Sequence, residues 1–213
     1  MTPTARSALV AGATGLVGGE LVRQLAEHPS YARLAVLLRR LPEAPLPERV
    51  EPVLVDYEHL DRSAAWFAVD DLFCALGTTI RQAGSQAAFR RVDHDYVVAV
   101  AQLARERGAR HFLLVSSLGA DARSRVFYSR VKGEVESAVR TPGYPSLTIV
   151  RPSLLLGPRS EFRLGEALVK PLAPLFPRRY RPVHARAVAA TMIRAALEDR
   201  PGVRIIESRD IVD

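Results

Sequence analysis

The chain has 213 residues, of which 48% are hydrophobic and 25% charged, proportions that allow one α/β domain with a substantial buried core. Its single cysteine, Cys74, excludes an intramolecular disulfide and a metal cluster built from cysteines, and no apolar run approaches the ~20 residues that span a bilayer. The net charge of +7 raises nucleic acid as a partner, but the densest basic cluster (Arg178, Arg179, Arg181 and Arg186) has few aromatic residues around it, so we expect solvated surface arginines there.

Short apolar runs alternate with helical patterns along the chain. In order, they predict a strand at 7–12, a helix at 15–27, strands at 34–40, 50–57 and 70–77, a helix at 89–107, a strand at 111–117, a helix at 124–140, a strand at 147–153, a helix at 184–199 and a last strand at 203–208. Continuous apolar strands between helices indicate a parallel sheet covered on both faces. We predict a doubly wound α/β domain over residues 1–213 with strand order 3-2-1-4-5-6, capped on the substrate side by the proline-interrupted residues 154–182.

A glycine-rich stretch, AGATGLVGGE, joins the first strand to the first helix and carries Gly12, Gly15 and Gly18. This context is typical of a dinucleotide-binding loop. Gly12 permits the tight turn, Gly15 lets the backbone approach a pyrophosphate, and Gly18 lets the helix pack closely on the strand. The helix N-terminus would offer free N–H groups to the phosphates. The alternative is a turn whose glycines serve packing alone.

The end of the second strand indicates which dinucleotide is bound. NAD-binding loops place an acidic residue there, against the ribose 2′-hydroxyl. This chain has Arg39 and Arg40 instead, and no acid until Glu43. Because arginine pairs well with a 2′-phosphate, we predict NADP(H), unless both arginines are solvated surface residues. Asp56, at the end of the third strand, is placed either to meet the adenine amino group or to cap a turn.

The stretch FYSRVKGEVE places Tyr128 and Lys132 four residues apart, on one face of a predicted helix. Lysine is rare here, with only two in the chain, so Lys132 stands out as a compact ammonium beside a phenol. Such a pair can exchange a proton with a carbonyl or an alcohol. Ser117 ends the fifth strand, where its hydroxyl could hold a substrate oxygen, whereas Ser116 could bond the backbone or the cofactor. The alternative for Tyr128 and Lys132 is a surface pair.

These motifs together resemble the short-chain dehydrogenase/reductase superfamily over essentially the whole chain. The resemblance to the superfamily rests on GATGLVG, SSLGA, YSRVK and VRPSLLLG. A closer resemblance, to the atypical branch of the superfamily called the Tat-interacting-protein oxidoreductase-like group, rests on FCALGTT, RRVDHDY and VKGEVE. It implies a Rossmann-like fold, NADPH binding and a Ser–Tyr–Lys site made by Ser117, Tyr128 and Lys132. It also places the 76–78 loop, Pro152 and Ser153 beside the cofactor, although the last two could form only a strand-ending turn. Asp93 stands where many members carry an asparagine that holds a proton-relay water.

The function expected from the sequence is NADPH-dependent reduction of a small carbonyl compound by a cytoplasmic monomer or homodimer, with no membrane and no metal. The rival function is an NADPH-binding regulatory protein that senses redox state without turnover. The residues expected at the cofactor are Gly12, Thr14, Gly15, Leu16, Val17, Gly18, Arg39, Arg40, Asp56, Leu76, Gly77, Thr78, Ser116, Tyr128, Lys132, Pro152 and Ser153.

Overall fold

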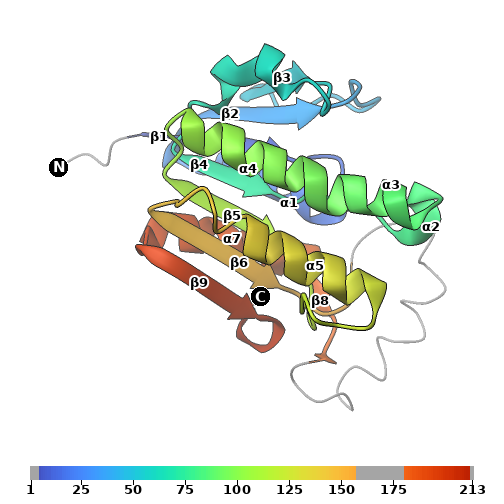
Figure 1. The fold of residues 1–213 in the computed structure, drawn as a ribbon. Helices are drawn as coiled ribbons and strands as arrows, with labels where there is room; N and C mark the ends of the chain where they lie inside the picture. The colour runs from blue at the N-terminus through green and yellow to red at the C-terminus, as the bar shows by residue number, and fades with distance from the viewer. Residues whose placement is uncertain (1–4, 157–179, 212–213) are drawn as a thin grey trace.

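The computed structural model describes residues 5–156 and 180–211, and these form a central parallel sheet between two layers of helices (Figure 1). The sheet has seven strands in the order β3-β2-β1-β4-β5-β6-β9. Its strands are β1 (Arg6–Ala11), β2 (Tyr31–Leu38), β3 (Val50–Leu54), β4 (Asp71–Cys74), β5 (His111–Val115), β6 (Ser146–Arg151) and β9 (Gly202–Glu207). The predicted order of the first six strands is confirmed, and β9 extends the sheet by pairing parallel to β6.

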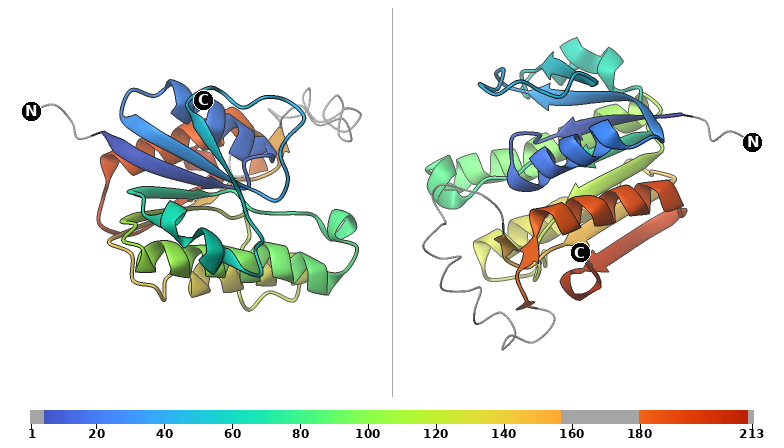
Figure 2. Two further views of the ribbon diagram at one scale, coloured as in Figure 1. Left: turned by 90° about the horizontal axis from the view of Figure 1, so that it is seen from above. Right: turned by 180° about the vertical axis from the view of Figure 1, so that it is seen from behind.

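Helices cover both faces of the sheet, as the view from above shows (Figure 2). One face carries α1 (Leu16–Glu27) and α7 (Ala185–Glu198). The other carries α4 (Tyr96–Glu106), α5 (Phe127–Ala138) and the 3₁₀ segment Leu60–Phe67. Two short helices, α2 (Ile80–Ala83) and α3 (Gln86–Arg90), lie beyond the carboxyl end of β4 and lead into α4 (Figure 1).

The alternation of side chains along the strands explains why both faces need a cover. In β1, Ala8 and Val10 point into the core under α1 and α7, whereas Leu9 and Ala11 point into the core under α4 and α5. All four are fully buried. A strand buried on both faces reads as an unbroken apolar run, and this is the pattern that predicted a parallel sheet.

Several predicted boundaries differ from the observed ones for local reasons. The helix expected from residue 124 begins only at Phe127, because the Ser124 hydroxyl accepts a hydrogen bond from Val126 N at 3.1 Å and holds a turn there. The helix expected from residue 89 begins earlier, at Gln86, where Ser85 Oγ caps it by accepting from Ala88 N at 3.1 Å. Most predicted strands are one to three residues too long at their carboxyl ends, where the chain leaves the sheet for the site-bearing loops.

Residues 157–179, which make up most of the predicted cap and include Arg178 and Arg179, lie outside the described residues. The flanking segments β7 (Leu155–Leu156) and β8 (Val183–His184) pair as a two-stranded parallel ribbon beside the main sheet. In the described ranges 5–156 and 180–211, none of the helices has both the length and the apolar character to cross a membrane.

Candidate active site

The loop between β1 and α1 owes its shape to glycines that the surrounding backbone requires. Gly12 has φ +85°, and a Cβ on it would lie 2.5 Å from the Ala75 carbonyl, so any side chain would collide with the end of β4. A Cβ on Gly18 would lie 2.0 Å from the Gly12 carbonyl oxygen. These two glycines therefore serve the close packing of helix on strand.

Gly15 differs from both of them. Its φ is −81°, which any residue can adopt, and a Cβ there would meet only the Gly12 carbonyl oxygen, at 3.4 Å. The missing side chain thus leaves a space that no other part of residues 5–156 and 180–211 fills. Gly15 is the N-cap of α1, whose first turn carries no acidic side chain. The N–H groups of that turn can donate to an anion without competition from a carboxylate.

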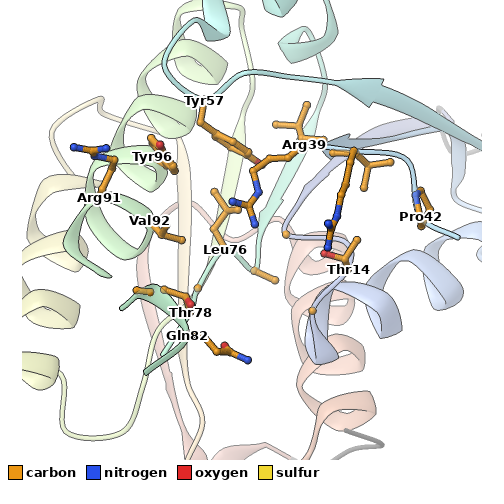
Figure 3. Close-up of a pocket in the computed structure, with 18 of the residues that line it drawn as sticks. Thr14, Arg39, Pro42, Tyr57, Leu76, Thr78, Gln82, Arg91, Val92 and Tyr96 are labelled. Atoms are coloured by element: carbon orange, nitrogen blue, oxygen red, sulfur yellow. The ribbon is translucent and has the colours of Figure 1, made fainter. Parts of the chain in front are cut away.

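A cleft of about 920 Å³ opens in front of this loop (Figure 3). It lies where the strand order reverses between β1 and β4, the place at which open α/β sheets bind their ligands. Eight predicted cofactor residues line it: Gly12, Thr14, Gly15, Arg39, Arg40, Leu76, Gly77 and Thr78. The cleft has the location and the donor groups of a dinucleotide site, and Gly15 leaves it room at the pyrophosphate position.

The far end of the cleft combines basic and aromatic side chains. Arg39 and Arg40 follow β2 and line it, and neither forms an ion pair within residues 5–156 and 180–211. Tyr57 and Tyr96 stack with ring centroids 5.0 Å apart, and Arg39 extends beside Tyr57 (Figure 3). Burial raises the pKa of Tyr57, so its hydroxyl stays neutral although the Arg39 charge acts in the opposite direction. Tyr57, Tyr96 and Arg91 were not predicted from the sequence.

Not every predicted cofactor residue faces the cleft. The carboxylate of Asp56 accepts a hydrogen bond from Glu58 N at 3.0 Å, so it closes a turn, and its neighbour Tyr57 lines the cleft instead. Val17 is buried under the sheet and Leu16 packs against the same core. Their side chains therefore support α1, and only their backbone N–H groups belong to its free N-terminal turn.

Lys132 lies one helical turn after Tyr128 on α5 and is almost completely buried. Its Nζ lies 2.7 Å from Oδ1 of Asp93, which is also buried. Burial disfavours the ammonium, but the Asp93 carboxylate and, to a smaller extent, Tyr128 together outweigh it, so the pKa of Lys132 lies above its ordinary value. Lys132 is therefore one half of a buried ion pair, and the phenol is not its main partner.

The same lysine reaches the wall of the dinucleotide cleft. A Cβ on Gly77, which lines the cleft, would lie 3.9 Å from Lys132 Nζ and 3.4 Å from Asp93 Oδ1. The ion pair thus lies directly behind the peptide of Gly77. Sequence reasoning noted Asp93 as an unusual residue but did not predict this pair.

The two serines after β5 have different environments. The Ser116 hydroxyl donates to Glu136 Oε1 at 2.5 Å, and Arg151 donates to both oxygens of the same carboxylate, at 2.9 and 2.6 Å. Ser117 Oγ is buried and has no hydrogen-bond partner within residues 5–156 and 180–211. A buried hydroxyl without a partner is costly, so Ser117 is the serine available to a ligand.

The loop after Ser117 is fixed against α5. Asp121 N donates to the Ser129 carbonyl at 3.0 Å, and a Cβ on Gly133 would lie 2.0 Å from Ala122 N. Gly133 therefore permits a contact that no other residue would allow. Tyr128 lies at the start of the same helix, partly exposed, with its ring 5.6 Å from that of Phe89.

The residues after β6 are held by the backbone. The Pro152 carbonyl accepts from Leu118 N at 2.8 Å, Ser153 N donates to Ser208 Oγ at 3.1 Å, and the Ser153 hydroxyl donates to the Arg181 carbonyl. Both residues lie at the carboxyl edge of the sheet, outside the lining of the cleft. Among the described residues, no three His, Cys, Asp or Glu side chains gather as metal ligands.

Residues 12–199 match a family model described as NAD(P)H-binding. The chain belongs to this NAD(P)H-binding family. The match spans the glycine loop, the cleft and α5. The family therefore has the same cofactor class that the geometry of the cleft indicates. The match does not distinguish NADP from NAD.

Relatives of this family member cover nearly the whole chain. Protein HTATIP2 of Rattus norvegicus is 36% identical and aligns over 97% of this chain and 88% of its own length. The mitochondrial protein FMP52 of Eremothecium gossypii is 34% identical over 97% of this chain and 96% of its own. The resemblance to the atypical dehydrogenase/reductase branch is thereby confirmed. The predicted cytoplasmic location is contradicted, because the FMP52 relatives are named mitochondrial proteins.

Solved structures with this fold share little sequence with the chain. MoeE5 in complex with UDP-glucose and NAD has a TM-score of 0.74 at 14% identity, covering 93% of this chain and 74% of its own. The Bordetella bronchiseptica enzyme WbmG in complex with NAD also has a TM-score of 0.74, at 15% identity, covering 98% and 75%. These likenesses confirm the predicted Rossmann-like fold.

Proposed function

We propose that the protein is an NADPH-dependent oxidoreductase that reduces a small carbonyl compound. The observation that carries the proposal is the juxtaposition at Gly77, which lines the dinucleotide cleft while a Cβ on it would lie 3.9 Å from Lys132 Nζ. The ammonium of the Tyr-x-x-x-Lys helix thus lies against the wall of that cleft, although Lys132 itself is not among the residues that line it.

The preference for NADPH is supported by the two arginines after β2. Arg39 and Arg40 line the cleft, no acidic residue follows β2 directly, and no carboxylate in the described part of the chain pairs with either guanidinium. A guanidinium matches the geometry and charge of a 2′-phosphate, whereas it offers a ribose 2′-hydroxyl no acceptor. Both side chains are therefore available for an additional phosphate.

Two residues of the chain would handle the substrate, and a third would hold the cofactor. A bound reduced nicotinamide supplies a hydride to the carbonyl carbon. The Tyr128 hydroxyl would donate a proton to the carbonyl oxygen, and because the side chain is partly exposed it can recover that proton from solvent. The Ser117 hydroxyl, which lacks a partner within residues 5–156 and 180–211, would donate a hydrogen bond to the same oxygen and stabilise its growing charge. Lys132 would hold hydroxyl groups of the ribose.

One observation favours the rival function, an NADPH-binding regulatory protein without turnover. The Asp93 carboxylate neutralises Lys132, so the ammonium has less charge left with which to favour a Tyr128 phenolate than an unpaired lysine would have. This weakens proton transfer in either direction, because a phenol that has donated its proton is left as the same phenolate. The Ser117 hydroxyl, which has no partner within residues 5–156 and 180–211, supports turnover, because a protein that only senses the cofactor has no need of it, and for that reason we place reduction ahead of a purely sensory role.

Titration with NADPH and NADH, followed by a screen of aldehydes, ketones and quinones, tests the proposal. We expect tighter binding of NADPH and carbonyl-dependent oxidation of NADPH that requires Tyr128. Tight binding without turnover of any carbonyl would support the regulatory function instead. Absence of binding would contradict both.

A further inference from the structure

Asp93 lies at the point where three elements of the site meet. It occupies the π-helical turn Arg91–Asp95 between α3 and α4, and only 1% of its surface is exposed. Oδ2 accepts a hydrogen bond from Thr78 N at 2.8 Å, while Oδ1 lies 2.7 Å from Lys132 Nζ. One carboxylate therefore joins the wall of the dinucleotide cleft to the helix that carries Tyr128.

The widened turn makes this geometry possible. A π-helical turn inserts a residue into an α-helix and redirects its side chains, and such turns occur often at functional sites. In this protein the π-helical turn lies between α3 and α4, beside the cleft. Arg91 and Val92 of the turn line that cleft. The next carboxylate on this turn, that of Asp95, is exposed and bonds His94.

The chemistry of the contact requires a carboxylate. An asparagine at residue 93 could accept from Thr78 N through its carbonyl oxygen, but its NH₂ group would then face the Lys132 ammonium, donor against donor. A carboxylate accepts from Thr78 N with one oxygen and presents the other to the ammonium, whose buried charge it compensates. Without that charge, burial would make the ammonium costly and lower the pKa of Lys132.

We propose that Asp93 is a positioning residue that fixes the Lys132 ammonium behind Gly77 and Thr78 and compensates its buried charge at the wall of the dinucleotide cleft. The inference rests on the proposed function in taking the cleft as the dinucleotide site. Its effect on the ligand passes through Lys132 and Thr78, because Asp93 is itself too deeply buried to line the cleft.

The other groups that face Lys132 do not replace Asp93. Tyr128 lies one turn earlier on α5, and Cys74 on β4 has its thiol pKa raised to about 12 by burial. The nearby Glu134 carboxylate is paired with Arg90. Within residues 5–156 and 180–211, Asp93 is the only carboxylate at ion-pairing distance from Lys132.

The charge state of Lys132 can be measured directly because the chain has only two lysines. In protein labelled with ε-¹³C-lysine, the Lys132 resonance is assigned by its absence in Lys132→Met. We expect Lys132 to lose its proton at a clearly lower pH in Asp93→Asn than in the wild type, where the carboxylate holds the pKa of Lys132 above its ordinary value. The matched control, Asp95→Asn, removes a neighbouring exposed carboxylate and should leave the titration unchanged.

The second readout is the pH dependence of NADPH binding. Between pH 7.5 and 10, where the 2′-phosphate is doubly ionised, the wild-type Kd should vary less than about twofold, whereas in Asp93→Asn it should weaken more than about threefold as Lys132 loses its proton. An identical lysine titration in Asp93→Asn and in the wild type would overturn the inference. If the wild type did not bind NADPH, the proposed function would fail, while the lysine titration would still test the action of Asp93 on Lys132.

A further variant covers the case in which Asp93→Asn does not fold. Lys132→Met leaves a buried carboxylate without its cation, and Asp93→Asn/Lys132→Met leaves neither charge. We expect the double variant to unfold at a higher urea concentration than Lys132→Met. A double variant that is no more stable than Lys132→Met would show that the two residues do not act as a charge pair and would contradict the proposal.

Discussion

The Ser116 hydroxyl donates a 2.5 Å hydrogen bond to the buried carboxylate of Glu136, two helical turns along α5 from Tyr128. Arg151 binds the same carboxylate, and its second partner, Glu207, lies 3.0 Å away at the end of β9. The network joins β5, β6 and β9 to α5 at the carboxyl edge of the sheet. Ser116 therefore belongs to the scaffold, whereas Ser117 beside it presents a hydroxyl that the described part of the protein does not use.

This difference predicts opposite effects for two adjacent alanine substitutions. Ser116→Ala should lower the free energy of unfolding by about 1–3 kcal/mol, because Glu136 loses one of its buried donors. Ser117→Ala should leave stability within about 0.5 kcal/mol and reduce carbonyl turnover by about 10²-fold. Urea unfolding and steady-state kinetics of both variants measure the two effects. Equal losses of stability would show that Ser117 is also structural.

Cofactor choice should depend on Arg39 and Arg40. Removing one charge-assisted phosphate contact should cost about 1.5–3 kcal/mol of NADPH binding, which is about tenfold or more in Kd. NADH binding should change little. Arg123→Ala, which removes an almost fully exposed guanidinium outside the cleft, is the matched control. Wild-type protein that binds NADH and NADPH equally would rule out the 2′-phosphate role of both arginines.

In the glycine loop, Gly12 is required by the fold, whereas Gly15 is required by the ligand. Gly15→Val has an allowed φ and room for its Cβ, so the folded structure should persist by circular dichroism while NADPH binding is lost. In Gly12→Val the valine would have to adopt a positive φ, which destabilises the folded state by about 1–2 kcal/mol, and its Cβ would collide with the Ala75 backbone. This variant should therefore lower the thermal midpoint markedly. Unchanged NADPH affinity in Gly15→Val would mean that the loop is only a packing turn.

His111 predicts a pH dependence of stability that is separate from the site. It is buried with Nε2 2.9 Å from Thr148 Oγ1, and burial is the main reason that its pKa falls to about 4, with the Asp199 charge opposing and that of Arg6 assisting. Because the folded protein favours neutral imidazole, this stabilisation is complete above pH 6.5 and is lost as the pH falls toward 4. The loss should amount to about 3 kcal/mol.

His111→Gln isolates that effect because glutamine keeps a partner for Thr148 but does not titrate in this range. Thermal midpoints measured from pH 7 to 4 should fall less steeply in His111→Gln than in the wild type. The neighbouring Asp71, whose pKa is raised by burial, contributes to both proteins and is removed by the comparison. Parallel pH curves for the two proteins would contradict the assignment.

The fold was largely predictable because the inner strands of the sheet, such as β1 and β4, are buried on both faces and the long helices on one. Val10 and Leu9 point to opposite sides of β1 and are both apolar, so the run reads as a strand without knowledge of its neighbours. The loops were less predictable, since polar side chains decide where an element ends. Ser124 delays α5 and Ser85 starts α3, and both effects depend on single hydrogen bonds.

The site was predicted in part for the same reason. The spacing of Tyr128 and Lys132 is a local property of a helix, and it placed both on one face. The partner of Lys132 could not be found this way, because Asp93 reaches it through a π-helical turn and a contact distant in sequence. For Asp56 the sequence left open a contact with the adenine or a turn role, because the third strand was predicted through residue 57. It ends at Leu54, and the following turn directs Tyr57 to the cleft.

The central claim is that Tyr128 protonates a carbonyl compound while the cleft holds NADPH. Its most direct test is the rate of carbonyl-dependent NADPH oxidation by the wild type and by Tyr128→Phe, using a carbonyl found by screening and protein shown by titration to bind NADPH. We predict that Tyr128→Phe binds NADPH with the wild-type Kd and loses at least about 10²-fold in kcat, because the ring packing against Phe89 is kept and only the proton donor is removed. Equal kcat values for the two proteins would contradict the account, because the proton would then come from another group.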